Sequence, residues 1–172
     1  MTLEIALDAD EDWDSSGEKP IDWKPLARKA AEAAIAESAY PELAASDRPV
    51  EISVTLSGDD QVRALNAKWR GKNKPTNVLS FPMADERDLG RANIAGAELL
   101  LGDIILAHGV CEAEAEEKGV SVETHATHLL VHGTLHLLGY DHHDDREAAD
   151  MEAREVRALA RLGIANPYEV TA

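Results

Sequence analysis

The sequence predicts one α+β domain over residues 1–172, with a small mixed sheet of four strands packed against about five helices. Three observations support this fold class. The length of 172 residues fits a single domain with its own core. Strand-like and helix-like segments are mixed along the chain without strict alternation, which is typical of an α+β domain. We find no internal repeat and no long low-complexity linker that would divide the chain.

The predicted strands are short segments whose apolar residues alternate with polar ones or run together. The clearest covers residues 50–56, where apolar and polar residues alternate at every position. Residues 2–7 alternate more weakly and predict a strand at the edge of the sheet. Two further apolar segments complete the four strands: residues 78–81, which Pro82 stops, and residues 98–106.

The predicted helices are marked by composition, apolar spacing and capping residues. An Ala-rich stretch predicts a helix over residues 22–38. Asp144 and Glu147 resemble a capping pair at the start of the last helix. The other expected helices cover residues 57–70, 107–118, 121–138 and 145–162, whereas residues 8–17 and 83–96 are expected to be loops.

The helix expected after the strand at residues 50–56 has clear limits. Ser57 followed by Asp60 resembles a helix start, and Gly71 is expected to end the helix. Leu65 and Trp69 lie four residues apart, which places them on one helical face. This spacing predicts that Trp69 packs in the core, and stacking on a base of a nucleic acid is the alternative.

The charge of the chain is strongly acidic but uneven. The net charge of −16 disfavours nucleic acid as a partner when taken alone, because phosphates repel an acidic surface. The segment 63–74 nevertheless contains no acidic residue and carries the basic residues Arg63, Lys68, Arg70, Lys72 and Lys74. A phosphate-binding face therefore remains an alternative.

Several features predict a cytoplasmic protein without a membrane segment. No stretch approaches the roughly 20 consecutive apolar residues that a membrane helix needs. The acidic start of the chain lacks the basic and apolar regions of a secretory signal. Cys111 is the single cysteine, so an intramolecular disulfide is excluded and the thiol is expected to pack as a small apolar group.

Six of the seven histidines fall between residues 125 and 143. His132 and His136 are four residues apart, so both imidazoles project from one face of a helix. Gly139 can adopt the left-handed conformation that ends a helix, which lets the chain turn back and bring His142 to the same point. Three protein ligands with a free fourth position are typical of catalytic zinc, whereas structural zinc has four ligands, usually with cysteines. The sequence therefore predicts a zinc helix of metalloprotease type, with one Zn²⁺ ion on His132, His136 and His142.

The spacing His-x-x-x-His-x-x-Gly-x-x-His is that of the metzincin peptidases. In those enzymes a glutamate follows the first histidine and acts as general base, but Gly133 holds that position here. A zinc peptidase is therefore an alternative without its usual base. His128 shares the helical face, but His128 and His136 lie about 12 Å apart along the axis, too far for one ion. We expect His128 to be buried and hydrogen-bonded.

The stretch from His132 to His142, HGTLHLLGYDH, resembles the signature of the YbeY endoribonucleases, a family of bacterial ribosomal RNA maturation factors. Further blocks resemble that family at residues 65–81 (LNAKWRGKNKPTNVLSF), 101–104 (LGDI) and 162–168 (LGIANPY). The resemblance implies a zinc-dependent, single-strand-specific endoribonuclease acting in 3′-end maturation of small-subunit ribosomal RNA and in ribosome quality control. It also implies zinc on the three histidines, a functional role for Arg70, and ribosomal RNA and the small ribosomal subunit or its assembly factors as partners.

Other residues are candidates for roles around the metal. A guanidinium suits phosphate, because two N–H groups can meet two oxygens and offset charge in the transition state. Arg70, to which the resemblance points, is therefore the expected catalytic residue, and the alternative from the residues alone is a solvated surface charge. Lys72 and Lys74 would hold the RNA backbone. Asp103 and Asp141 are candidates to orient a ligand histidine, and a role in a turn or a cap is the alternative for each. A third hypothesis, beside nuclease and peptidase, is a ribosome-assembly factor whose zinc is mainly structural.

Overall fold

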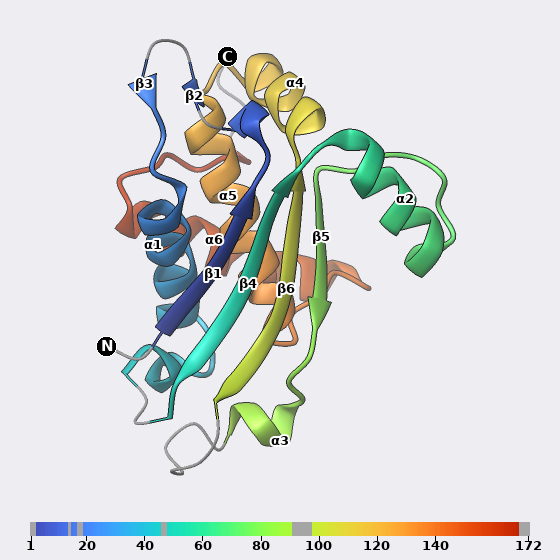
Figure 1. Cartoon of the computed structure of the whole chain (residues 1–172). Coiled ribbons are helices and arrows are strands. Elements are labelled where there is room, and N and C mark those ends of the chain that lie inside the picture. The colour runs from blue at the N-terminus through green and yellow to red at the C-terminus, as the bar shows by residue number, and fades with distance from the viewer. Residues whose placement is uncertain (1–2, 14, 17–18, 46–47, 91–97, 169–172) are drawn as a thin grey trace.

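The fold was described from a computed structural model, which covers residues 3–13, 15–16, 19–45, 48–90 and 98–168. Its main sheet has the strand order β1-β4-β6-β5 (Figure 1). β1 pairs with β4 and β4 with β6 in parallel, whereas β5 runs antiparallel to β6. The strands are β1 (Leu3–Ala9), β4 (Val50–Ser57), β5 (Val78–Pro82) and β6 (Leu99–Ala107). The predicted mixed sheet of four strands is confirmed, with β1 at one edge.

The helices form a layer on one face of this sheet and a smaller cover on the other (Figure 1). The α-helices of the described residues are α1 (Trp23–Ala36), α2 (Asp59–Arg70), α3 (Glu86–Leu89), α4 (His108–Lys118), α5 (Val122–Leu137) and α6 (Asp145–Arg161). Five of them match the predicted helices. None of the described helices is both long and apolar enough to cross a membrane.

Two segments expected to be loops contain short elements. α3 lies within the predicted loop 83–96, where the Asp85 and Asp88 side chains form a reciprocal capping box. The acidic segment 8–17 contains the turn η1 (Glu11–Trp13) and the strand β2 (Ser15–Ser16), which pairs with β3 (Lys19–Pro20). A second 3₁₀ turn, η2 (Pro41–Ala45), leads into β4. Residues 91–97 lie outside the described residues.

The main core lies between the sheet and the layer formed by α1, α4, α5 and α6. Alternate residues of β6, such as Ile104 and Leu106, are buried on this side. Ile105 belongs to a separate apolar cluster that includes Val62 of α2 and Leu79 of β5. α2 therefore covers the opposite face of the sheet at its β5–β6 end. Cys111 is fully buried in the main core, which confirms its apolar packing, and burial raises the pKa of its thiol to about 12.

α2 has the predicted end but not the predicted packing of its last turn. It begins at Asp59 after Gly58, one position later than Ser57 would imply, and ends at Gly71, whose φ of 68° is left-handed. The prediction that Trp69 packs in the core is wrong, because this side chain is 63% exposed. Figure 1 shows that the C-terminal end of α2 extends outward beyond the edge strand β5.

α6 is held against the end of α1 by charged side chains. Arg157 Nε and Arg161 Nε donate to the two carboxylate oxygens of Glu37 at 2.9 and 2.6 Å. These hydrogen bonds, first that from Arg161 and then that from Arg157, lower the pKa of Glu37. Asp144 caps the N-terminus of α6 by accepting from the Glu147 N–H at 2.8 Å, so the predicted cap is confirmed. The cap and the Glu37 contacts fix α6 along the main core.

Gly102 lets β6 approach two neighbours at once. The pairing of β4 with β6 shifts by one residue there, since Glu51 pairs with Leu100 and Ile52 pairs with Gly102. Gly102 has a φ of 144°, and a Cβ at this position would lie 2.3 Å from the carbonyl oxygen of Phe81. The same Cβ would lie 2.8 Å from a methyl group of Leu137, near the end of α5. β6 therefore requires glycine here to contact both β5 and α5.

We predict that Gly102→Ala lowers the free energy of unfolding by more than about 2 kcal/mol, because the added methyl group forces apart backbones that are in contact. Gly58→Ala is the matched control, since a Cβ at position 58 meets nothing within 4 Å; its cost should stay near or below about 1 kcal/mol. Urea unfolding of both variants checks the difference. Equal midpoints for the two variants would contradict this packing.

Candidate metal centre

α5 and the turn that follows it bring three imidazoles together. His132 and His136 project from one face of α5, and their Nε2 atoms lie 3.0 Å apart. Gly139, with a φ of 95°, then turns the chain back towards α5. The His142 ring centroid lies 5.4 Å from that of His136 and 5.9 Å from that of His132. The turn thus adds the third imidazole to the pair that the helix supplies.

The chemistry and spacing of these side chains fit one metal ion. One nitrogen from each of His132, His136 and His142 lies within 4.8 Å of the other two, and this is the one such group found among the described residues. Two nitrogens bound tetrahedrally to one zinc ion, each at about 2.0–2.1 Å, lie about 3.3 Å apart. The spacing of 3.0 Å between the first pair is close to this value. The ligand chemistry of the three histidines and their grouping within 4.8 Å therefore fit one divalent ion.

Glu155 of α6 orients the first of these histidines. Its carboxylate is fully buried, and its Oε1 accepts a hydrogen bond from Nδ1 of His132. This bond fixes the ring and keeps the proton on Nδ1, so that the lone pair of Nε2 is directed at the metal position. Burial alone would raise the pKa of Glu155, but hydrogen bonds from His128 and His132 outweigh it and lower the pKa to about 2. Glu155 is thus a buried anion beside the metal position.

The second oxygen of this carboxylate binds two further side chains. Oε2 of Glu155 lies 3.2 Å from Nε2 of His128 and accepts a hydrogen bond from the hydroxyl of Tyr168. The rings of His128 and Tyr168 meet edge to face, with centroids 5.4 Å apart. The expectation that His128 is buried and hydrogen-bonded is confirmed. The segment after α6 therefore returns to the metal centre through Tyr168.

The ligand histidines differ in their surroundings. Burial, and then the neighbouring His132, lower the pKa of His136 to about 4. His136 is therefore neutral at pH 7 and free to donate its lone pair to a metal. His142 is more open, with 58% of its side chain exposed. The site is thus buried on the α6 side and accessible on the side of the Gly139 turn.

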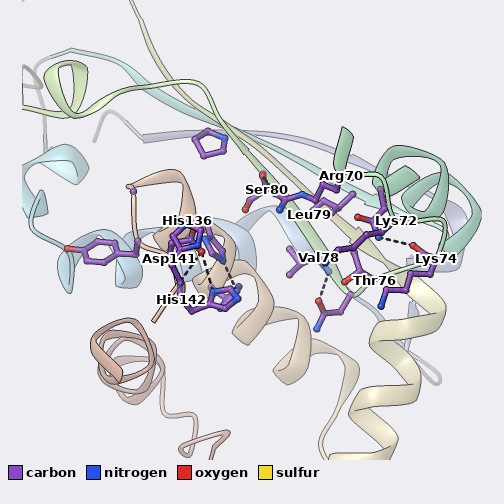
Figure 2. Close-up of a pocket in the computed structure, with 17 residues that line it drawn as sticks. Arg70, Lys72, Lys74, Thr76, Val78, Leu79, Ser80, His136, Asp141 and His142 are labelled. Atoms are coloured by element: carbon purple, nitrogen blue, oxygen red, sulfur yellow. Dashed lines mark hydrogen bonds and ion pairs between the residues drawn. The ribbon is translucent and has the colours of Figure 1, made fainter. Parts of the chain in front are cut away.

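The accessible side opens into a cavity of about 680 Å³ that also reaches the basic segment. Figure 2 shows the histidines on one side of this cavity and Arg70, Lys72 and Lys74 on the other, with β5 between them. Further polar side chains that line it are Asn66, Thr76, Asn77, Ser80, Asp141 and His143. The three histidines and the basic side chains of residues 70–74, which lie far apart in the sequence, are thus two walls of one cavity.

Arg70, the expected catalytic residue, lies in the cavity wall at the end of α2. Its Nη2 donates to the carbonyl oxygen of Ser80 at 3.1 Å, which anchors the guanidinium on β5. A guanidinium has several N–H donors in a rigid plane, so the bond to Ser80 leaves donors for a ligand. Arg70 therefore lies in the wall of the same cavity that the three histidines line.

The two aspartates considered as orienting groups differ in their surroundings. Oδ1 of Asp141 lies 3.5 Å from Nδ1 of the ligand His142, as expected of an orienting group, and it also accepts from the backbone N–H of His142 at 2.8 Å. Oδ2 of Asp141 pairs with Nε2 of His143 at 2.8 Å. Asp141 thus shapes the turn that carries His142. Asp103 lies on β6 opposite Phe81. Within the part of the chain that the structure describes, the carboxylate bound to a ligand histidine on α5 is Glu155, so the assignment to Asp103 is wrong.

Sequence reasoning missed Glu155, although one signal was present. Met151 and Leu159 lie four residues before and after it, and both are buried on the apolar face of α6. A glutamate in the middle of such a face needs a partner, because an unpaired buried carboxylate is costly. Combined with a histidine-rich helix elsewhere in the chain, this pattern could have identified the orienting group.

Gly133 faces the sheet and not the cavity. A Cβ at this position would lie 3.0 Å from Cγ2 of Ile104, so α5 packs closely on β6 there. A glutamate side chain would have to displace Ile104, and it would point away from the metal ligands. The position that carries the general base in metzincins therefore cannot carry one in this packing.

Two kinds of comparison relate this chain to known proteins. Residues 13–163 match the family model described as endoribonuclease YbeY. An endoribonuclease YbeY from Novosphingobium aromaticivorans is 54% identical over 168 residues, which cover 96% of each chain. One from Rhizorhabdus wittichii is 51% identical over 170 residues, which cover 98% of each chain.

A solved structure has a similar fold. The solution structure of TM1509 from Thermotoga maritima superposes with a TM-score of 0.51 and 22% sequence identity. The match covers 97% of this chain and 100% of the other. This likeness supports the α+β fold described above.

We predict that Glu155→Gln weakens zinc binding by about 10- to 100-fold, because the amide is neutral and holds the His132 N–H less strongly than the carboxylate does. Glu152→Gln is the matched control, since Glu152 is exposed on the same helix. Competition with a chromophoric chelator measures both affinities. If the two variants bound zinc equally well, Glu155 would have no part in orienting the ligand.

Proposed function

This chain belongs to the endoribonuclease YbeY family, and we propose that it is a metal-dependent endoribonuclease that cuts single-stranded RNA. The observation that carries this proposal is the shared cavity. A three-histidine centre with an accessible side forms one wall, and basic side chains form the other. A phosphodiester is the substrate that both walls suit, because it carries a negative charge that basic side chains bind and a phosphoryl oxygen that a Lewis acid polarises.

The residues that line the cavity have different roles in phosphodiester cleavage. A divalent ion, when bound by the three histidines, supplies a Lewis acid that polarises a phosphoryl oxygen and acidifies water. Arg70 directs its free N–H groups at the phosphate and offsets the charge that develops during the reaction. Lys72 and Lys74 neutralise neighbouring phosphates and hold the strand without reading its sequence.

Glu155 gives the centre its charge balance. A divalent ion on three neutral imidazoles keeps both positive charges, and the buried carboxylate adjoining His132 offsets one of them. The fixed Nδ1–H of His132 also prevents that ring from turning away when the cavity is filled. Glu155 is thus a positioning residue that does not itself face the cavity.

The zinc-peptidase alternative lacks support in this fold. Its general base would sit at Gly133, which faces Ile104 instead of the cavity. A mainly structural zinc is disfavoured as well, since the centre has three protein ligands and one of them, His142, is largely exposed. Both features favour an ion that meets a substrate.

Membership of this family supports more specific proposals about the metal ion, the substrate and the partners. We propose that the ion is a single Zn²⁺, because borderline ligands such as imidazole suit it. We further propose that the substrate is ribosomal RNA, that the cut serves 3′-end maturation of the small-subunit RNA, and that the small ribosomal subunit or its assembly factors are the partners. A cytoplasmic site of action accords with this substrate.

We predict that His132→Ala loses bound metal and RNA cleavage together, because it removes one of three ligands. His143→Ala should keep its metal, since His143 lies next to a ligand in the chain but is exposed and paired with Asp141. Metal content by mass spectrometry and cleavage of a labelled single-stranded RNA are measured on the same preparations. Cleavage by metal-free His132→Ala protein at the wild-type rate would defeat the proposal.

We predict that Arg70→Ala lowers kcat by about 100-fold or more while the metal content stays unchanged, because the loss affects charge in the transition state. Arg70→Lys should recover only part of the rate, since an ammonium lacks the planar pair of donors. Arg63→Ala is the control: Arg63 is exposed on the same helix and bonded to Asn73. A wild-type kcat in Arg70→Ala would remove Arg70 from the machinery.

A further inference from the structure

Trp69 is a large aromatic side chain exposed beside the cavity. It is 63% exposed, whereas Trp13 and Trp23, the other two tryptophans of the chain, are 1% and 4% exposed and pack against each other. An indole is among the most apolar groups in proteins and is usually buried. Trp69 lies on the surface at the last turn of α2, where its indole is available to a binding partner.

The surroundings of Trp69 are positively charged. Nζ of Lys68 lies 5.0 Å from the centroid of the indole ring, a cation–π contact that covers one side of the ring. The basic segment 63–74 surrounds it with no acidic residue, in a chain whose net charge is −16. This local charge is complementary to a polyanion, and the remaining ring face is apolar. Nucleic acid combines these two properties, since it alternates charged phosphates with flat aromatic bases.

Trp69 is also continuous with the site already described. It is not among the residues that line the cavity, but its neighbour Arg70 is, as is Asn66 one turn earlier on α2. Adjacent Cα atoms are about 3.8 Å apart, so Trp69 lies just outside the rim that Arg70 forms. An RNA strand that left the cavity past Arg70 would meet the indole within a nucleotide or two.

We propose that Trp69 is a stacking platform for one base of a single-stranded RNA whose scissile phosphate lies in the cavity. This inference rests on the proposed function and names a binding position outside the metal centre. The indole stacks on a base face, and Lys68 and Arg70 hold the phosphates on either side of that base. Bases in a duplex are covered on both faces by their neighbours, so the platform accepts only an unpaired base. It therefore contributes to a preference for single-stranded RNA.

The inference can be tested by tryptophan emission, because two of the three indoles are buried. Binding of a short single-stranded oligouridine to the wild-type protein should quench the emission of Trp69 and leave that of Trp13 and Trp23 unchanged. Trp69→Leu keeps an apolar side chain without a ring; it should lose this quenching and bind the oligonucleotide about 5- to 100-fold more weakly. Trp69→Phe should recover most of the affinity, since a phenyl ring also stacks. Gel analysis after each titration confirms that the RNA is still intact.

An oligonucleotide with abasic sites separates stacking from charge. It keeps the phosphates, so the wild-type protein should bind it through the basic residues, but without quenching the indole. The proposal is overturned if the abasic strand quenches Trp69 equally, or if Trp69→Leu binds oligouridine as tightly as the wild type while the wild type still cuts RNA. The second outcome would leave the nuclease function intact and would favour a protein surface as the partner of the indole. Failure of the wild type to bind or cut RNA would defeat the proposed function as well.

Discussion

Helix α5 is buried on almost every side, and this constraint decides where its histidines can point. It packs against α1, α4 and α6 and against strands β5 and β6. A helix surrounded in this way can leave only a narrow strip for polar side chains. His132 and His136 occupy that strip, and the left-handed Gly139 brings the chain back so that His142 faces it. The packing of α5 in the core therefore determines where the three histidines meet.

The same burial would leave the charge of a bound divalent ion without compensation, and a carboxylate on α6 supplies that compensation. Imidazoles in an apolar setting are held neutral, as the lowered pKa of His136 indicates. A divalent ion placed there would leave uncompensated positive charge, and the carboxylate of Glu155 provides the compensation from behind. On the open side the charges are reversed, since Arg70 and its basic neighbours face the cavity. This acidic chain thus places basic side chains where a phosphate would enter.

Much of this arrangement could be predicted from the sequence, because local periodicity reports local structure. The alternation in residues 50–56 and the four-residue spacing of His132 and His136 each follow from the geometry of one element. Long-range pairings are not determined by one element: the bond of Glu155 to His132 depends on how α6 docks, and the exposure of Trp69 depends on where the sheet ends. The spacing of Trp69 from Leu65 was helical, as expected, yet helical spacing only states which residues share a face. It does not state what lies opposite that face.

The most direct test of the whole account is a titration of the metal-free protein with Zn²⁺, with the rate of RNA cleavage recorded at each addition. If three imidazoles hold one catalytic ion, the rate rises in proportion to the zinc added and becomes constant at one equivalent per chain. Cleavage at the full rate before any metal is added would contradict the account, because the convergence of His132, His136 and His142 would then have no role in the reaction.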